Sequence, residues 1–157
     1  MRVRIVTVGR AGRLFSDLTT EYEGRARRYW SLDIVEVREE RARRGLSAEE
    51  VRGRESRRLT EKVPSGYEVI ALSRLGRSWS SVELAHYLER LAIDRRPGAA
   101  FLIGGALGLS GELLGMAHHQ LSLSTLTLPH ELARSILTEQ IYRAGTILRG
   151  EPYHKGS

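Results

Sequence analysis

The residues best suited to chemistry lie in the last third of this 157-residue sequence. The apolar run AAFLI (99–103) ends at Gly104 and Gly105, and Gly108 follows shortly after. Adjacent glycines after an apolar run are typical of a strand that turns sharply and lets another group approach its backbone. Ligands of open parallel sheets bind beyond the C-terminal ends of the strands, so this turn is a candidate ligand site. An ordinary strand-to-helix turn explains the same glycines.

The glycine spacing fits neither of the common phosphate-binding motifs. A dinucleotide site needs G-x-G-x-x-G after an early strand and an acid about 20 residues later. Here Ile103 occupies the place of the first glycine, and STLTL (124–128) stands where the acid is expected. No Lys-Ser or Lys-Thr pair follows the glycines, as a phosphate-binding loop requires. A nucleotide-binding oxidoreductase is therefore a weak alternative.

The segment LSLSTLTL (121–128) has two interpretations. It has the pattern of a final strand, with Pro129 in the first turn of the helix that follows. It is also long for a strand, and its polar residues are all hydroxyls. Such a segment could leave the sheet and offer backbone N–H and C=O groups to a ligand. Adenine and a small amino-acid moiety are recognised in this way in apolar pockets.

Two ionisable residues follow this segment. His130 could orient a substrate base or take a proton, or it could be a structural histidine. Arg143 lies among apolar positions of the last helical pattern, so its guanidinium needs an anion or carbonyl partner. Glu139, one helical turn earlier, is the alternative partner to a substrate.

The C-terminal residues also include groups that could contact RNA. Tyr153 could stack on a base, while His154 and Lys155 could contact phosphates. His118 and His119 are adjacent and so cannot share one helix face, and we expect no metal site there.

Alternating strand and helix patterns must position these residues. The strand-like runs are RVRIVTV (2–8), LDIVEV (32–37), YEVIALS (67–73), AAFLI (99–103) and LSLSTLTL (121–128). Helical patterns lie between them, and Ser47 with Glu50 and Ser80 with Glu83 have the spacing of capping boxes. This order predicts an α/β fold with a mostly parallel sheet and helices on both faces.

The region between the second and third strands is highly charged. Val51 and Leu59 give only a narrow apolar stripe, which favours a solvated helix of mixed charge. The alternative is a basic arm that contacts phosphates, with Arg41, Arg43, Arg44, Arg52, Arg54, Arg57 and Arg58.

The charge of the sequence predicts an anionic partner. The formal net charge is +6, and all of the 25 basic residues except Lys62 and Lys155 are arginines. A guanidinium binds two phosphate oxygens at once. GC-rich codons also favour arginine over lysine, but the positive excess itself indicates a partner such as nucleic acid.

The composition excludes several classes of protein. The sequence has no cysteine, which excludes disulfides, thiolate chemistry and cysteine zinc sites. No apolar run approaches the about 18 residues of a membrane span, and the N-terminal run is too short for a signal peptide. The length predicts a single domain over residues 1–157, and the lack of a visible export signal predicts a cytoplasmic protein.

Four segments together carry a resemblance to a known family. They are LIGGALGLS (102–110), LSLSTLTLPHELAR (121–134), EQIYRA (139–144) and PYHK (152–155). In this order and spacing the sequence resembles, over essentially its whole length, the bacterial large-subunit rRNA pseudouridine N3-methyltransferases of the SPOUT superfamily.

The resemblance implies more than the residue patterns do. It implies a SPOUT-type sheet with a C-terminal deep trefoil knot, S-adenosylmethionine as methyl donor, and a homodimer that uses no metal and no membrane. The implied substrate is N3 of a pseudouridine in 23S rRNA, within the assembled 70S ribosome. It also implies that the tail closes on the active site, which gives roles to His130, Arg143, Tyr153, His154 and Lys155.

The resemblance also implies a set of cofactor-binding residues. They come from the end of the third strand, the glycine turn and the segment before Pro129, and they are Leu72, Gly104, Leu123, Ser124, Thr125, Leu126, Thr127 and Leu128.

The sequence departs from the family pattern at a few positions. Many members have a proline and an acid at the positions of Ala106 and Leu107, and an aspartate at the position of Ser73. A catalytically silent, RNA-binding relative is therefore the alternative function.

Overall fold

The computed structural model describes residues 1–41 and 45–154. Its strands and helices alternate along the chain, in the order β1 (Arg2–Val8), α1 (Arg13–Ala26), β2 (Ser31–Val37), α2 (Ala48–Thr60), β3 (Glu68–Ser78), α3 (Ser81–Ile93), β4 (Gly98–Ile103), α4 (Gly111–Met116), β5 (His119–Ser122), α5 (His130–Leu148) and the short 3₁₀ helix η1 (Pro152–His154).

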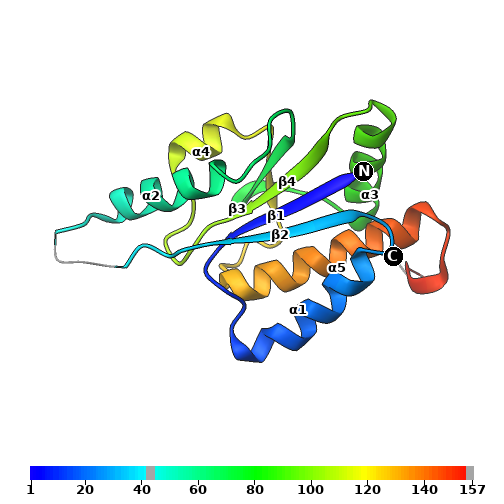
Figure 1. The fold of residues 1–157 in the computed structure, drawn as a ribbon, viewed down its shortest axis with the longest axis horizontal. Coiled ribbons are helices and arrows are strands. Elements are labelled where there is room, and N and C mark those ends of the chain that lie inside the picture. Colours follow the sequence, from blue (N-terminus) through cyan, green and yellow to red (C-terminus); the bar gives the residue numbers. More distant parts are fainter. Residues whose placement is uncertain (42–44, 155–157) are drawn as a thin grey trace.

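The strands form one five-stranded sheet in the order β2-β1-β4-β3-β5, and every pair of neighbouring strands is parallel. Helices α2 and α4 lie on one face of the sheet, and α1, α3 and α5 lie on the other (Figure 1). The predicted α/β fold with a parallel sheet and helices on both faces is therefore confirmed. The single-domain organisation and the knot stay predictions.

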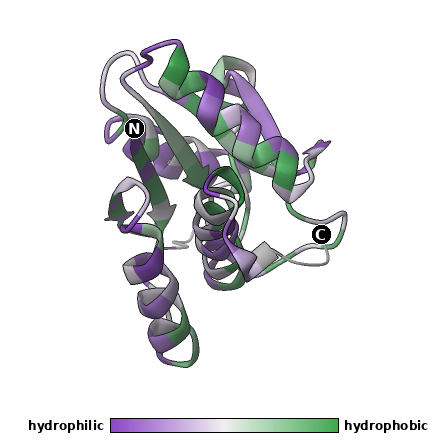
Figure 2. Cartoon of the chain, turned by 90° about the vertical axis from the view of Figure 1, so that its right-hand side faces the viewer, coloured by the Kyte–Doolittle hydropathy of each residue, from purple (hydrophilic) through white to green (hydrophobic). Residues whose placement is uncertain are grey.

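The strands are apolar on both sides because both faces of the sheet are covered. In β1, Val3 and Ile5 pack toward α1, α3 and α5, whereas Val6 and Val8 pack toward α2 and α4. In Figure 2 green stretches accordingly occur on strands as well as on helices, and the helices mix green with purple. This two-sided core holds the C-terminal ends of β1, β3 and β4 in a fixed arrangement.

Both predicted capping boxes are present. The hydroxyl of Ser47 accepts a hydrogen bond from the backbone N–H of Glu50, and Ser80 and Glu83 are paired in the same way. In α2, Val51 and Leu59 are buried as predicted, and Arg54 and Arg58 pair with Glu40. The charged region therefore contains the expected helix of mixed charge; Arg43 and Arg44 lie outside the described residues.

Two strands end at other residues than their strand-like runs do. The last strand covers only His119–Ser122, and the chain then leaves the sheet, so the second interpretation of residues 121–128 is confirmed and the long final strand was wrong. Strand β3 continues to Ser78, past the predicted end at residue 73. A bulge between Leu72 and Arg77 makes this possible, and at Gly76 a Cβ atom would lie only 2.5 Å from the carbonyl oxygen of Gln120.

Helix α5 is fixed to α1 and β2 by buried polar contacts. The guanidinium of Arg134 donates to Glu23 at 2.8 Å and to Glu36 at 2.6 Å, and Thr19 and Ser135 share a hydrogen bond of 2.7 Å. Buried charges are stable only when paired in this way. These contacts fix where α5 begins. Within the described residues, no helix is both long enough and apolar enough to cross a bilayer.

Candidate active site

The C-terminal ends of the strands surround a cavity of about 900 Å³, which we call the strand-end cavity. Its walls are the end of β3 with its bulge, the glycine turn after β4, and the segment between β5 and α5. The lining residues are Arg52, Leu72–Leu75, Ile103–Leu109, Gly111, Leu114, Leu121, Leu123, Ser124 and Leu126–His130 with Ala133. The volume lies within the range of small-molecule sites, about 300–1,000 Å³.

The glycine turn is tight, and its geometry explains its glycines. Gly108 donates to the carbonyl of Gly105 at 3.0 Å and has a φ of +79°, a conformation that favours glycine. At Gly104 an added Cβ would lie 2.8 Å from the backbone carbonyl carbon of Gly108. The absence of a side chain at Gly104 is therefore required by the turn itself. A bulky residue there would distort the turn as well as narrow the cavity.

Residues 123–128 form an irregular segment with available backbone groups. The hydroxyl of Ser124 accepts from the N–H of Leu126 at 3.0 Å, and the hydroxyl of Ser122 donates to the carbonyl of Ser124 at 3.0 Å. Among the described residues, no partner is found for the backbone N–H groups of Thr125, Thr127 and Leu128. The hydroxyls thus shape the segment, and these amides can bind a ligand.

The structure brings together most residues of the predicted cofactor site. Seven of the eight line the strand-end cavity, namely Leu72, Gly104, Leu123, Ser124, Leu126, Thr127 and Leu128. Thr125 is exposed and is not among the lining residues. Two cations at the cavity, Arg52 and Arg74, were not predicted for the cofactor site, and Arg52 was named only in the alternative basic arm. Both reach the cavity through the packing of α2 and the bulge of β3, which no local pattern marks.

His130 begins α5 and lines the same cavity. Its Nε2 atom lies 3.8 Å from Oε1 of Glu39, which follows β2. A Cβ atom on Gly9 would lie 3.1 Å from this nitrogen and 2.5 Å from the carboxylate oxygen of Glu39. The end of β1 therefore leaves room for the imidazole beside a carboxylate. A histidine in this position can orient a ligand or exchange a proton with it.

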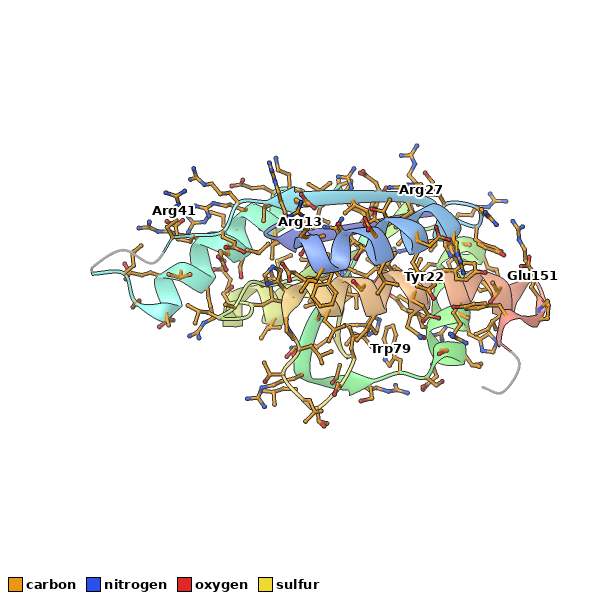
Figure 3. All side chains as sticks on the ribbon, turned by 90° about the horizontal axis from the view of Figure 1, so that it is seen from below. Arg13, Tyr22, Arg27, Arg41, Trp79 and Glu151 are labelled. Atoms are coloured by element: carbon orange, nitrogen blue, oxygen red, sulfur yellow. The ribbon has the colours of Figure 1, made fainter. Side chains whose placement is uncertain are left out.

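Arg143 and Tyr153 form a second group, outside the strand-end cavity. Arg143 donates to Oε1 of Glu139 at 2.7 Å, and the hydroxyl of Tyr153 donates to the same oxygen at 3.0 Å. The guanidinium of Arg143 lies 4.8 Å from the centre of the Tyr153 ring. Tyr22, which is labelled in Figure 3, and Tyr142 complete this aromatic cluster. Burial raises the pKa of Tyr153, so its hydroxyl stays protonated at neutral pH.

The two groups lie far apart on one chain. His130 is the first residue of α5 and Arg143 is near its end, which separates them by about 20 Å along the helix axis. The Glu139 pair that sequence spacing offered as an alternative partner of Arg143 is present. The side chain of His154 and the whole of Lys155 lie outside the described residues, so their roles stay predictions.

A buried carboxyl group supports the glycine turn from below. Glu55 on α2 is 4% exposed; its Oε1 accepts from the N–H of Glu40 at 2.9 Å, and its Oε2 has no partner among the described residues. A Cβ on Gly105 would lie 2.8 Å from that Oε2. The next residue, Ser56, accepts from the N–H of Ser110 at 2.9 Å. Helix α2 therefore holds both ends of the turn.

Replacement of Glu55 by glutamine is expected to flatten the pH dependence of stability. Burial raises the pKa of Glu55, so the folded state favours the neutral carboxyl. The stability that this group contributes is complete below its unfolded pKa of about 4.3. It is lost as the pH rises through the raised value. Urea denaturation at several pH values from about 4 to 8 should therefore show a free energy of unfolding that falls less in Glu55→Gln than in the wild type.

The exposed capping residue Glu50 supplies a control of opposite sign. Its pKa is lowered by hydrogen bonds from Ser47, so its contribution is present above its unfolded pKa and is lost as the pH falls. Glu50→Gln should therefore change how the free energy of unfolding depends on pH at the acid end of the range. If the free energy of unfolding depends on pH in the same way in the wild type and in Glu55→Gln, the carboxyl group beneath the turn titrates normally.

Within residues 1–41 and 45–154, no cluster of histidine and acidic side chains has the arrangement of a metal site. The strand-end cavity also has no acidic residue among those that line it. The site therefore offers apolar side chains, free backbone amides, an imidazole and guanidinium groups. These suit a ligand with an apolar ring system and a carboxylate, next to an anionic partner.

Comparisons with known proteins show similarity over almost the whole chain. The family described as "Predicted SPOUT methyltransferase" matches residues 1–154. A protein of Gemmatimonas aurantiaca named ribosomal RNA large subunit methyltransferase H is 46% identical over 158 aligned positions, which cover 99% of this chain and 100% of that protein. Proteins of the same name from Acetivibrio thermocellus and Clostridioides difficile are each 41% identical, with 99% of this chain and 100% of each relative covered.

Solved structures share the fold at low sequence identity. A probable methyltransferase from Bordetella pertussis has a TM-score of 0.56 and 16% identity, with 91% of this chain and 95% of that chain covered. A probable methylase family protein from Haemophilus influenzae has a TM-score of 0.53 and 14% identity, with 98% and 70% covered.

Proposed function

The chain belongs to the SPOUT methyltransferase family, and from this premise we propose that it methylates large-subunit rRNA with S-adenosylmethionine as the methyl donor. The observation that carries the proposal is the full-length similarity to proteins named for this activity. We further propose that the target atom is N3 of a pseudouridine in 23S rRNA, and that the enzyme acts in the cytoplasm on the assembled 70S ribosome.

The residues around the strand-end cavity fit such a methyl donor. Leu72, Leu123 and Leu128 offer an apolar surface for adenine, and the unpartnered amides of Thr127 and Leu128 offer hydrogen bonds. The glycine turn lets the ligand approach the backbone closely. When bound, the donor supplies a methyl group on a sulfonium, which needs no activation by the protein.

The methyl acceptor, unlike the methyl donor, needs activation by side chains of the protein. A ring N–H must lose its proton before or during methyl transfer, so a base or a cation that stabilises the developing negative charge is required. We assign the base or orienting role to His130, which lines the cavity. We assign charge stabilisation to Arg143, whose guanidinium is already desolvated in part and held by Glu139.

A homodimer would bring these two groups to one site. Because His130 and Arg143 are about 20 Å apart along α5, one chain cannot place both at the same substrate atom. A second copy in antiparallel orientation would bring its Arg143, Tyr153, His154 and Lys155 to the first copy's cavity. The strongly exposed Leu14 and the half-exposed Leu18 on α1, which packs beside α5, support an interface on this side.

Transfer of labelled methyl groups to ribosomes tests the proposed function. The protein is incubated with tritiated S-adenosylmethionine and 70S ribosomes that lack the modification, and the labelled nucleotide is then mapped. We expect label on a pseudouridine of the 23S rRNA and none on the 16S rRNA. Binding of the donor by calorimetry without any transfer would instead favour the catalytically silent relative, a reading motivated by Ala106, Leu107 and Ser73.

A further inference from the structure

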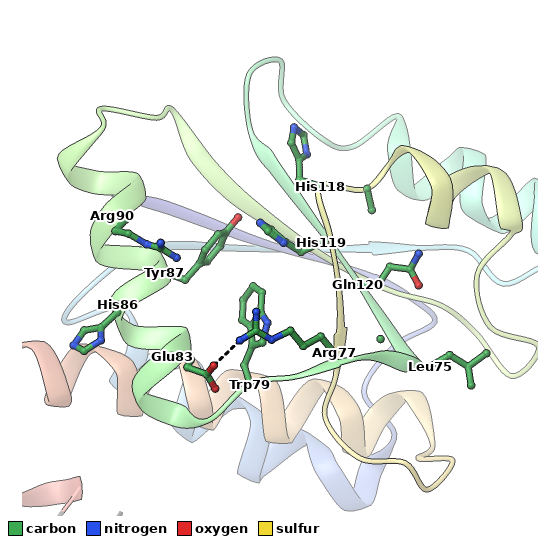
Figure 4. A pocket seen from close by; sticks show the side chains of 12 residues that line it. Leu75, Arg77, Trp79, Glu83, His86, Tyr87, Arg90, His118, His119 and Gln120 are labelled. Atoms are coloured by element: carbon green, nitrogen blue, oxygen red, sulfur yellow. Dashed lines mark hydrogen bonds and ion pairs between the residues drawn. The ribbon is translucent and has the colours of Figure 1, made fainter.

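A second cavity, of about 570 Å³, opens on the other side of the β3 bulge. We call it the aromatic cavity. It lies between the end of β3, helix α3 and strand β5, and its lining includes Arg77, Trp79, Tyr87, Arg90 and His119 (Figure 4). Leu75 lines both cavities. The aromatic cavity is therefore next to the strand-end cavity but is not used by the proposed reaction.

Three aromatic rings form one wall of the aromatic cavity. The ring centres of Trp79 and Tyr87 are 4.9 Å apart, those of Tyr87 and His119 are 5.0 Å apart, and those of Trp79 and His119 are 5.4 Å apart. Trp79 is only half-buried. Exposed aromatic faces beside a cavity are the common way in which proteins bind unpaired bases, because every base has a π face that can stack.

The hydroxyl of Tyr87 is a buried polar group that the protein leaves without a partner. The residue is 7% exposed, and its oxygen accepts and donates no hydrogen bond within the described residues. Figure 4 shows the hydroxyl end of the ring turned toward His119. Burial raises the pKa of Tyr87, so the group keeps its proton and can donate it to an acceptor. An unpaired buried hydroxyl is costly, which favours an occupant that supplies the missing partner.

The rim of the aromatic cavity is basic. Arg77 and Arg90 line it together with His86 and His118, and Glu83 is the one acid among its lining residues. Arg77 donates to Glu83 at 2.8 Å, yet its side chain is 75% exposed and so remains accessible. Guanidinium groups at the edge of an aromatic wall are suited to the phosphate that accompanies a base.

We propose that the aromatic cavity binds an unpaired nucleotide of the RNA substrate, with the base on Trp79 and the phosphate on Arg77. The hydroxyl of Tyr87 donates to a carbonyl oxygen or ring nitrogen of that base. This inference rests on the proposed function, because it takes RNA as the substrate. It adds a contact for a second nucleotide, distinct from the one that receives the methyl group.

The fluorescence of Trp79 reports whether the aromatic cavity is occupied. The protein contains two tryptophans, and the other one, Trp30, is buried with its indole N–H donating to the carbonyl of Ile141 at 2.8 Å. We expect uridine 5′-monophosphate, added without any methyl donor, to quench the fluorescence of Trp79. Trp79→Phe should abolish the change while the Trp30 signal remains. The test is therefore independent of cofactor binding and of methyl transfer.

Substitutions at the cavity provide the decisive comparison. Tyr87→Phe removes one hydroxyl and should weaken nucleotide binding by about 5- to 10-fold. Arg77→Gln should weaken it by a similar factor of about 10. Arg13→Gln serves as the matched control, because Arg13 is an exposed arginine at the start of α1, outside this cavity, and should leave binding unchanged (Figure 3).

Several results would overturn the proposal. One is a Trp79 fluorescence that does not respond to the nucleotide, and another is an equal nucleotide affinity in the wild type and Tyr87→Phe. A third is a fluorescence response to inorganic phosphate as large as the response to the nucleotide, which would indicate an anion site alone. A change in Trp79 fluorescence on raising the protein concentration without nucleotide would show that a second copy covers the cavity. Labelled methyl transfer to ribosomes is measured separately, so failure here would leave the proposed function standing.

Discussion

An equimolar mixture of His130→Ala and Arg143→Ala is expected to recover about a quarter of the wild-type methyl-transfer rate, although each variant alone is nearly inactive. In a two-fold symmetric dimer, about half of the mixed molecules are hybrids, and each hybrid has one site with both groups intact. Each single substitution removes about 2–4 kcal/mol of transition-state stabilisation, or about 30- to 1000-fold in rate. Tritium transfer to 70S ribosomes, after the subunits have exchanged, measures the recovery.

The structural reason is the separation of the two groups along α5. His130 lines the strand-end cavity at the start of the helix, whereas Arg143 is held by Glu139 near its end. Arg27→Ala is the matched control, because Arg27, like Arg143, makes an i,i+4 pair with a glutamate, here Glu23 at the C-terminal end of α1. It should leave the rate unchanged. A mixture that stays as inactive as its components, despite confirmed hybrids, would contradict a site shared between two chains.

Ala106→Trp is expected to weaken binding of S-adenosylmethionine by about 100-fold or more. Ala106 is exposed at the tip of the glycine turn and lines the strand-end cavity, so an indole there fills space that the ligand requires. The turn should survive, because Ala106 does not have a positive φ, unlike Gly108. Isothermal titration calorimetry measures the affinity, and the shift of the unfolding temperature by the ligand gives a second readout.

This substitution is a cleaner test than a bulky residue at Gly104, where a Cβ would strike the backbone of Gly108. Ala92→Trp is its control: Ala92 is an exposed alanine on α3 that lines neither cavity. Equal affinities for the ligand in Ala106→Trp and Ala92→Trp would exclude the strand-end cavity as the cofactor site. A lower unfolding temperature in both variants would show only the general effect of an exposed indole.

Patterns of neighbouring residues in the sequence were sufficient to predict most of the fold. The apolar runs of the first four strands and the Ser-x-x-Glu capping boxes depend on neighbours in the sequence, and each formed where expected, although β3 continues beyond its predicted end. The pair of Arg143 with Glu139 follows from helical spacing in the same way. Local pattern could not decide where the last strand ends, because residues 123–128 suit both a strand and a segment that leaves the sheet. The chain leaves the sheet after Ser122, which pairs with Ser78 at the end of β3.

The candidate site also has some features that the sequence alone predicts and others that only the tertiary structure shows. The sequence alone determined the family, the glycine turn and seven of the residues that line the strand-end cavity, because most of these lie in two short segments with recognisable order. Only the tertiary structure decided that Glu55 lies beneath Gly105, and that Trp79, Tyr87 and His119 form one wall. The physical reason is that these relations join residues from different elements. Their distances depend on how the helices pack on the sheet, and no local spacing encodes that packing.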